Sequence, residues 1–220
     1  RVLGLGYPKS AECSVGSVYV GEFKRGYFPE SCPPSSHITL RFDRPGKDDL
    51  EFHWMDGGIQ PTRPEELGPN EMMGDGGNGV IIEGTKGKMM CSTYGVNPQL
   101  LPTSKTKDIK VEETLYRVPG GDRGHYDNWV NACIAGHGST EFKQLSSPFS
   151  IAGPLTESVL MGNLAIRSYD YQAPKGLLSN QVEYPGRGIK LLWDGPNMKI
   201  TNFDPANQFV TRTYRSGFTL

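Results

Sequence analysis

Alternation of apolar and polar side chains predicts a β-hairpin over residues 35–56. A period of two is typical of strands with one buried face. The turn falls at Arg44-Pro45-Gly46-Lys47-Asp48, which combines proline, glycine and charged residues. The expected inward positions are Ile38, Leu40, Phe42, Leu50, Phe52 and Trp54.

A second hairpin is predicted over residues 80–92, with Thr85-Lys86-Gly87 as its turn. Residues 57–79, which precede it, have no apolar periodicity, and a loop of that length is usually functional or disordered. Residues 109–118 (IKVEETLYRV) are a further strand candidate.

Two helices follow from a period of 3.6. The first is expected from about Tyr126 to just before Gly136, and the second from about Pro154 to Ser168. Asp204-Pro205 suits the start of a third, short helix. The expected apolar faces are Trp129, Val130, Cys133 and Ile134 in the first helix, and Leu155, Val159 and Leu160, widened by Met161 and Leu164, in the second.

Composition favours a fold that is rich in sheet and turns. The 220 residues include 28 glycines and 17 prolines, and only 36% are hydrophobic. The predicted order, strands followed by helices, disfavours a doubly wound parallel sheet. We therefore expect an α+β fold, with one domain as the default for this length.

Charge and motif content remove several classes of function. The net charge of −1 gives no basic footprint for nucleic acid, and no apolar run is long enough to span a membrane. The four cysteines form no CxxC pair and the four histidines no HxxxH pair, so we expect no metal site. Cys91 and Cys133 lie in apolar runs and are expected in the core.

The run Gly74-Asp75-Gly76-Gly77-Asn78-Gly79 matches G-x-G-x-x-G literally. A dinucleotide site needs a strand before this motif and a helix after it. Here the run leads into Val80-Ile81-Ile82, which is strand-like, so we interpret it as a loop entering a hairpin and expect no cofactor site.

The candidate site starts at Trp54-Met55-Asp56-Gly57-Gly58. An aromatic ring and a carboxylate at the end of a strand suit a sugar, which stacks and donates hydroxyl protons. Alternatively, Trp54 fills the core and Asp56 caps a turn; spacing alone leaves both open. Arg63 could clamp an anionic group or only be solvated. His125 and Tyr126 could contact substrate or satisfy the free N–H donors at the start of the first helix.

Several short motifs, in order along almost the whole chain, resemble the C-terminal domain of the glucose-fructose oxidoreductase / inositol dehydrogenase / MocA family, in its bacterial branch. They are Leu5–Glu12, Trp54–Gly58 with Pro61–Pro64, Gly84–Met90, Tyr94-Gly95, Leu100–Pro102, Asn128–Cys133, Leu155–Ala165, Leu192–Asp194 and Tyr214–Phe218. Met55 and Phe218 depart from the family pattern, which has an aromatic residue and a tryptophan there.

The resemblance implies a large, open, predominantly antiparallel sheet with helices on one face. It implies that residues 1–220 form a substrate-binding and oligomerisation domain of an NAD(P)-dependent sugar or polyol oxidoreductase. The nucleotide-binding Rossmann domain and the catalytic residues are then expected upstream of Arg1, so the chain alone should be inactive.

The resemblance implies a substrate-binding role for five residues. Trp54, Asp56 and Arg63 match the family motif, and His125 and Tyr126 are expected to lie near them. The implied partners are the Rossmann domain, the sugar or polyol, and further copies of the chain bound through the sheet. A stand-alone carbohydrate-binding module and half of an NAD-dependent glycoside hydrolase are the alternatives. The sequence leaves the compartment, cytoplasmic or periplasmic, open.

Overall fold

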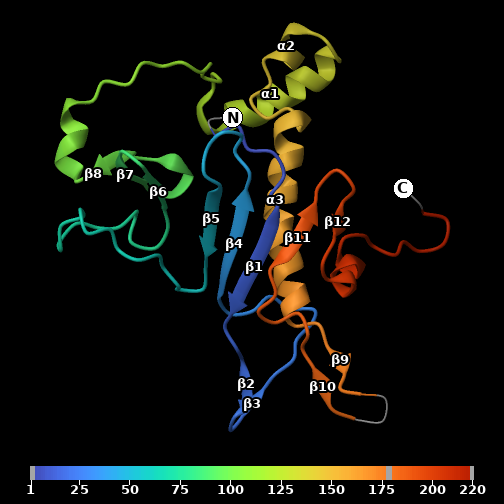
Figure 1. Cartoon of the computed structure of the whole chain (residues 1–220). Coiled ribbons are helices and arrows are strands. Elements are labelled where there is room, and N and C mark those ends of the chain that lie inside the picture. The colour runs from blue at the N-terminus through green and yellow to red at the C-terminus, as the bar shows by residue number, and fades with distance from the viewer. Residues whose placement is uncertain (1–2, 177–179, 219–220) are drawn as a thin grey trace. The chain divides into compact units, whose positions relative to one another are not determined.

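The computed structural model describes residues 3–176 and 180–218 (Figure 1). The chain divides into two compact units, the first formed by Arg1–Ile59 with Leu145–Leu220 and the second by Gln60–Gln144. Antiparallel sheets and a few helices make up the structure, which confirms the predicted α+β class.

A five-stranded antiparallel sheet forms the centre of the first unit, in the order β12-β11-β1-β4-β5. The strands are β1 (Ser10–Val15), β4 (Ser36–Phe42), β5 (Leu50–Met55), β11 (Leu191–Asp194) and β12 (Lys199–Ile200). The predicted hairpin is confirmed, since β4 and β5 pair from His37 opposite Met55 to Phe42 opposite Leu50.

The long helix α3 (Phe149–Tyr169) covers one face of this sheet (Figure 1). Burial alternates along β4, so Ser36, Ile38, Leu40 and Phe42 face the core. Ala11, Leu191, Trp193 and Ile200 complete the core from the neighbouring strands, with Met161, Leu164 and Ala165 from α3. The other face of the sheet carries mainly polar side chains.

The predicted apolar stripe of α3 is only partly confirmed. Met161 and Leu164 are buried as expected, but Leu155, Val159 and Leu160 are exposed, and Gly162 and Ala165 are buried in their place. Small residues explain the choice, because a Cβ on Gly162 would lie 2.9 Å from Cδ1 of Ile38. The helix therefore presents the small residues Gly162 and Ala165 to the sheet together with Met161 and Leu164.

The boundaries of α3 also differ from the prediction. It starts at Phe149, so Pro154 lies inside the helix. The third predicted helix is present as the 3-10 helix η3 (Asp204–Phe209), with Pro205 in its first turn. Two small ribbons complete the unit: β2 (Tyr19–Gly21) with β3 (Lys24–Arg25), and β9 (Ala173–Pro174) with β10 (Val182–Glu183).

A three-stranded sheet, β6-β7-β8, organises the second unit. Strands β6 (Val80–Gly84) and β7 (Gly87–Cys91) confirm the second predicted hairpin, and β8 (Gln99–Leu101) was not predicted. The 3-10 helices η1 (Thr93–Gly95) and η2 (Thr103–Asp108) flank β8. Leu67, Met90 and Leu101 form the small core.

The strand predicted at residues 109–118 is not formed. Val111, Leu115 and Tyr116 are exposed along this segment. A β-strand needs a hydrogen-bonding neighbour as well as suitable side chains, and none pairs here among the described residues.

Helix α1 (Gly121–Ala135) begins earlier than predicted, and the short α2 (Thr140–Lys143) follows it. The predicted face of α1 is wrong, since Trp129, Val130 and Ile134 are exposed together with Cys133, whereas Gly124 and Ala132 are buried. In the described ranges, no helix has the length and apolar character that crossing a membrane would need.

Candidate functional site

Trp54 and Asp56 meet at the end of β5. Both carboxylate oxygens of Asp56 are used: Oδ1 accepts from the backbone N–H of Ser36 at 2.6 Å, and Oδ2 accepts from Ser36 Oγ at 2.9 Å and Trp54 Nε1 at 3.1 Å. Ser36 is buried at the start of β4. Asp56 therefore closes the open end of the hairpin and orients the indole ring.

Gly57 makes this corner possible. Its φ is +64°, and a Cβ there would lie 2.1 Å from the backbone oxygen of Pro34. Only glycine fits a left-handed backbone so close to another chain segment. The chain thus bends sharply directly after Asp56.

The Trp54 ring is not buried in the core. Trp54 pairs with Ile38 and therefore points to the α3 side of the sheet, but β5 is the edge strand. The side chain is 54% exposed, and Phe52, two residues earlier on the same side, is 43% exposed. Trp54 offers an accessible aromatic face held in place by Asp56.

Arg63 stabilises the loop that contains it. Its Nη2 donates to the backbone oxygens of Gly68 and, at 2.6 Å, of Glu71. The Glu71 carboxylate in turn accepts from Gly68 N at 2.6 Å and from Thr103 Oγ1. The Thr103 hydrogen bond is the main cause that lowers the pKa of Glu71, with the Gly68 hydrogen bond second.

His125 and Tyr126 lie inside α1, not before it, which corrects their predicted place. The helix starts at Gly121 because Gly120, at φ +98°, makes the turn into it. The two rings pack edge to face with centroids 5.8 Å apart, and Tyr126 is 71% exposed. Trp54 and Asp56 belong to the first unit, and Arg63, His125 and Tyr126 to the second.

The run from Gly74 to Gly79 forms a turn that leads into strand β6. Asp75 holds the turn: its carboxylate accepts from Asn78 N at 2.7 Å, from Gly77 N at 3.2 Å and from Thr93 Oγ1. These hydrogen bonds, that of Thr93 first, lower the pKa of Asp75 to about 2. A dinucleotide needs a helix at this place, so these residues do not fit one.

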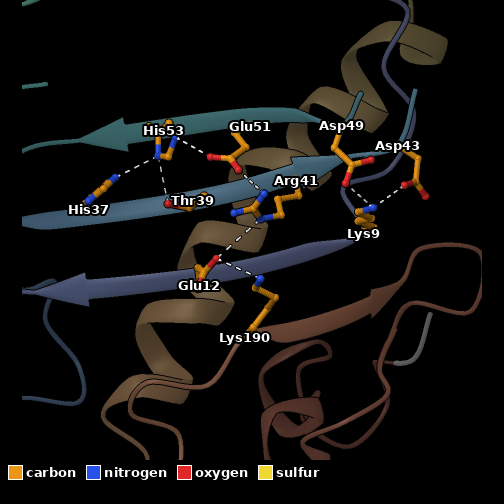
Figure 2. Close-up of polar contacts among 10 residues, drawn as sticks. All are labelled: Lys9, Glu12, His37, Thr39, Arg41, Asp43, Asp49, Glu51, His53 and Lys190. Carbon is orange, nitrogen blue, oxygen red and sulfur yellow. Dashed lines mark hydrogen bonds and ion pairs between the residues drawn. The ribbon is translucent and has the colours of Figure 1, made fainter. Parts of the chain in front are cut away.

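The open face of the five-stranded sheet carries a second cluster, which the sequence did not predict (Figure 2). It crosses the sheet as alternating charges. Lys190 lies 3.7 Å from Glu12 Oε1, Arg41 contacts both Glu12 and Glu51, and Glu51 Oε2 lies 3.3 Å from His53 Nε2. The polar positions of the predicted β4–β5 hairpin could have indicated part of this cluster. No pattern in the sequence indicated that β1 pairs with β4.

Two histidines end this cluster. His37 Nε2 and His53 Nδ1 are 3.2 Å apart, and Thr39 Oγ1 lies 3.1 Å from the same His53 nitrogen. A shallow cavity of about 230 Å³ adjoins His37, and Glu12, Ser14 and Thr39 are among the other residues that line it.

Lys9 forms a separate ion-pair group near one end of β4 (Figure 2). Its Nζ lies 2.7 Å from Asp43 Oδ1 and 2.6 Å from Asp49 Oδ2. The hydrogen bonds to Asp43 and Asp49 raise the pKa of Lys9, and that from Lys9 lowers the pKa of Asp49. This group tethers the segment before β1 to the β4–β5 turn.

Within the described part of the chain, no group of three or more His, Cys, Asp or Glu side chains could hold a metal ion. The sequence matches no protein-family model and no curated protein. The sheet and the geometry of its two clusters are therefore the basis for a functional proposal.

Proposed function

We propose that this chain is the substrate-binding and assembly part of an NAD(P)-dependent sugar or polyol oxidoreductase, similar to the glucose-fructose oxidoreductase / inositol dehydrogenase / MocA family. The observation that carries the proposal is the antiparallel five-stranded sheet, covered by α3 on one face and polar on the other. Four of the sequence motifs, Leu5–Glu12, Trp54–Gly58, Leu155–Ala165 and Leu192–Asp194, lie at least partly on this sheet or on α3.

In this proposal, Trp54 is the sugar platform. Pyranose rings and cyclitols present C–H groups that stack on an aromatic face, and a half-exposed indole provides such a face. Asp56 acts as a positioning residue, since its oxygens already accept from Ser36 and Trp54. Arg63, His125 and Tyr126 are the further candidates for substrate contact.

The nicotinamide nucleotide belongs, in this proposal, to a separate Rossmann domain. When bound there, NAD(P) would accept or donate the hydride, and this chain would hold the substrate against it. Exposed apolar side chains on the α3 side of the sheet, including Phe52, Leu155 and Val159, suit contact with further protein.

Calorimetric titration of the chain with NADH and NADPH tests whether nucleotide binding belongs to a separate domain. The expected result is no saturable heat for either nucleotide, because the glycine-rich run leads into a strand. Saturable NADH binding to the chain alone would contradict the proposal.

Saturation-transfer NMR with myo-inositol and glucose tests the platform. We expect transfer to the ring C–H protons that Trp54→Ala abolishes and Trp129→Ala leaves intact, since Trp129 is an equally accessible indole on α1. Equal loss in both variants, or transfer that survives Trp54→Ala, would remove Trp54 from the site.

The proposed assembly surface is the open, polar face of the sheet. Alternating charges can pair with a second copy across a two-fold axis. Sedimentation velocity should then show self-association that Leu192→Asp, on this face, weakens and Lys47→Asp, in the β4–β5 turn, does not. A monomer at high concentration would argue against this part of the proposal.

A stand-alone carbohydrate-binding module is the second candidate, and the exposed Trp54 ring favours it. Sugar affinity separates the two. A module that works alone should bind its sugar tightly, whereas one wall of a two-domain site should bind weakly until the nucleotide domain is added.

A further inference from the structure

His37 and His53 place two imidazole nitrogens beside each other on the open face of the sheet (Figure 2). They lie on neighbouring strands and are offset by two residues, because His37 pairs with Met55 and His53 with Thr39. Six registered residue pairs between β4 and β5 fix this arrangement. The pairing fixes the two backbones, and the side chains bring His37 Nε2 and His53 Nδ1 to 3.2 Å.

The carboxylate of Glu51 lies beside the outer nitrogen of His53. Its Oε2 is 3.3 Å from His53 Nε2, and its negative charge favours the tautomer with the proton on that nitrogen. In that tautomer the lone pair is on Nδ1, which faces His37 and Thr39. A carboxylate behind a histidine ring in this way orients metal-binding histidines in many proteins.

The separation of the two nitrogens fits a shared metal ion as well as a shared hydrogen. Two nitrogens, each about 2.0–2.1 Å from one metal at right or tetrahedral angles, are about 2.9–3.4 Å apart. A metal ion would take the place of the hydrogen between the rings, and His37 would carry its hydrogen on Nδ1. The His53 side chain is 41% exposed, so water can reach the site.

The cavity of about 230 Å³ reaches the site from the His37 side. It is lined by His37 and Thr39, together with Glu12 and Ser14. The nearby guanidinium of Arg41 is paired with Glu12 and Glu51, so its charge is balanced locally.

We propose that His37 and His53 form a two-imidazole site for a divalent transition-metal ion of the Ni²⁺, Cu²⁺ or Zn²⁺ class, with water completing the coordination. Imidazole suits these ions, and the affinity order places Cu²⁺ above Ni²⁺ and Zn²⁺. The two histidines lie on the sheet face that we also propose for assembly, but their test involves neither nucleotide nor sugar, so its failure is distinguishable from a failure of the proposed function.

Calorimetric titration with NiCl₂ tests the site. The exposed thiols are first removed with Cys32→Ser and Cys133→Ser, which gives a parent without these competing ligands. We expect one ion per parent chain, with binding weakened by at least about tenfold in His37→Gln and in His53→Gln. His137→Gln is the matched control, because His137 packs on Phe142 in the second unit, and it should leave binding unchanged.

Two results would overturn the proposal: a parent that binds no Ni²⁺ up to about 1 mM, or affinity that survives both site substitutions. Electron paramagnetic resonance of the parent with one equivalent of Cu²⁺ needs no substitution at the site. Hyperfine coupling to two equivalent imidazole nitrogens supports the site, and coupling to one or none contradicts it.

Discussion

The indole Nε1 of Trp54 donates a 3.1 Å hydrogen bond to Oδ2 of Asp56, two residues further along the chain. The same oxygen accepts from Ser36 Oγ. One carboxylate therefore links the last residues of β5 to the first residue of β4, and it fixes the exposed ring that we propose as the sugar platform.

Asp56→Asn should lower the free energy of unfolding by about 1–3 kcal/mol, because an amide nitrogen would face donors that need an acceptor. Urea unfolding followed by circular dichroism measures the loss. Asp48→Asn, at an exposed carboxylate in the β4–β5 turn, is the control and should change little. Equal effects in the two variants would mean that Asp56 does not hold the corner.

Gly57→Ala should destabilise the protein more than Gly46→Ala does. Both glycines have positive φ, +64° and +72°, so both substitutions carry the strain of the left-handed region, about 1–2 kcal/mol. Only at Gly57 would the new Cβ also meet backbone, at 2.1 Å from Pro34 O. The difference between the melting temperatures of the two variants measures the effect of the contact with Pro34. Equal decreases in melting temperature would refute that effect.

The turn held by Asp75 should loosen only in strong acid. The folded pKa, about 2, lies below the unfolded value of roughly 3.9. Its stabilisation is therefore complete above the unfolded pKa and is lost as the pH falls through about 2. Carbon-detected NMR of the Asp75 carboxyl gives the midpoint, and the Asn78 amide should shift with it.

Thr93→Val removes the largest contribution to that low pKa and should raise the Asp75 midpoint. Thr85→Val, in the β6–β7 turn, is a matched substitution away from the carboxylate. A midpoint that stays in place in Thr93→Val would show that the hydroxyl is not the cause.

Cysteine labelling should divide the thiols by burial. Burial, with the charge of Asp170 as a smaller cause, raises the pKa of Cys13 to about 12, whereas Cys32 and Cys133 are exposed. Since the thiolate is the nucleophile, iodoacetamide at pH 8 should modify Cys32 and Cys133 long before Cys13. Mass spectrometry of the peptides gives the order, and early modification of Cys13 would contradict its burial.

The hairpin could be predicted because its signals are local. Alternation from Ile38 to Phe42 and the Pro45-Gly46 turn specify both strands and their register. The outward positions that carry His37 and His53 follow from the same alternation. The contact between the His37 and His53 rings does not follow from alternation, because it depends on which diagonal neighbours on the two strands approach each other.

The helix faces could not be predicted from apolar periodicity alone. In α3, Leu155 and Val159 have the correct spacing, but contact with the sheet goes to Gly162 and Ala165, whose small size permits a close approach. In α1, too, small residues are buried in preference to a large apolar one: Gly124 and Ala132 are buried and Trp129 is exposed. Periodicity identifies a helix, whereas the shape of its neighbour selects the face.

The order of strands in the central sheet has a consequence for how the protein is made. Ala11 pairs with Leu40 on one side and with Leu191 on the other, and the whole second unit lies between these partners in the chain. Contacts between distant residues form late, because closing a long loop costs entropy. During synthesis on the ribosome, the nested segment Gln60–Gln144 can therefore fold before β11, the second neighbour of β1, has been translated.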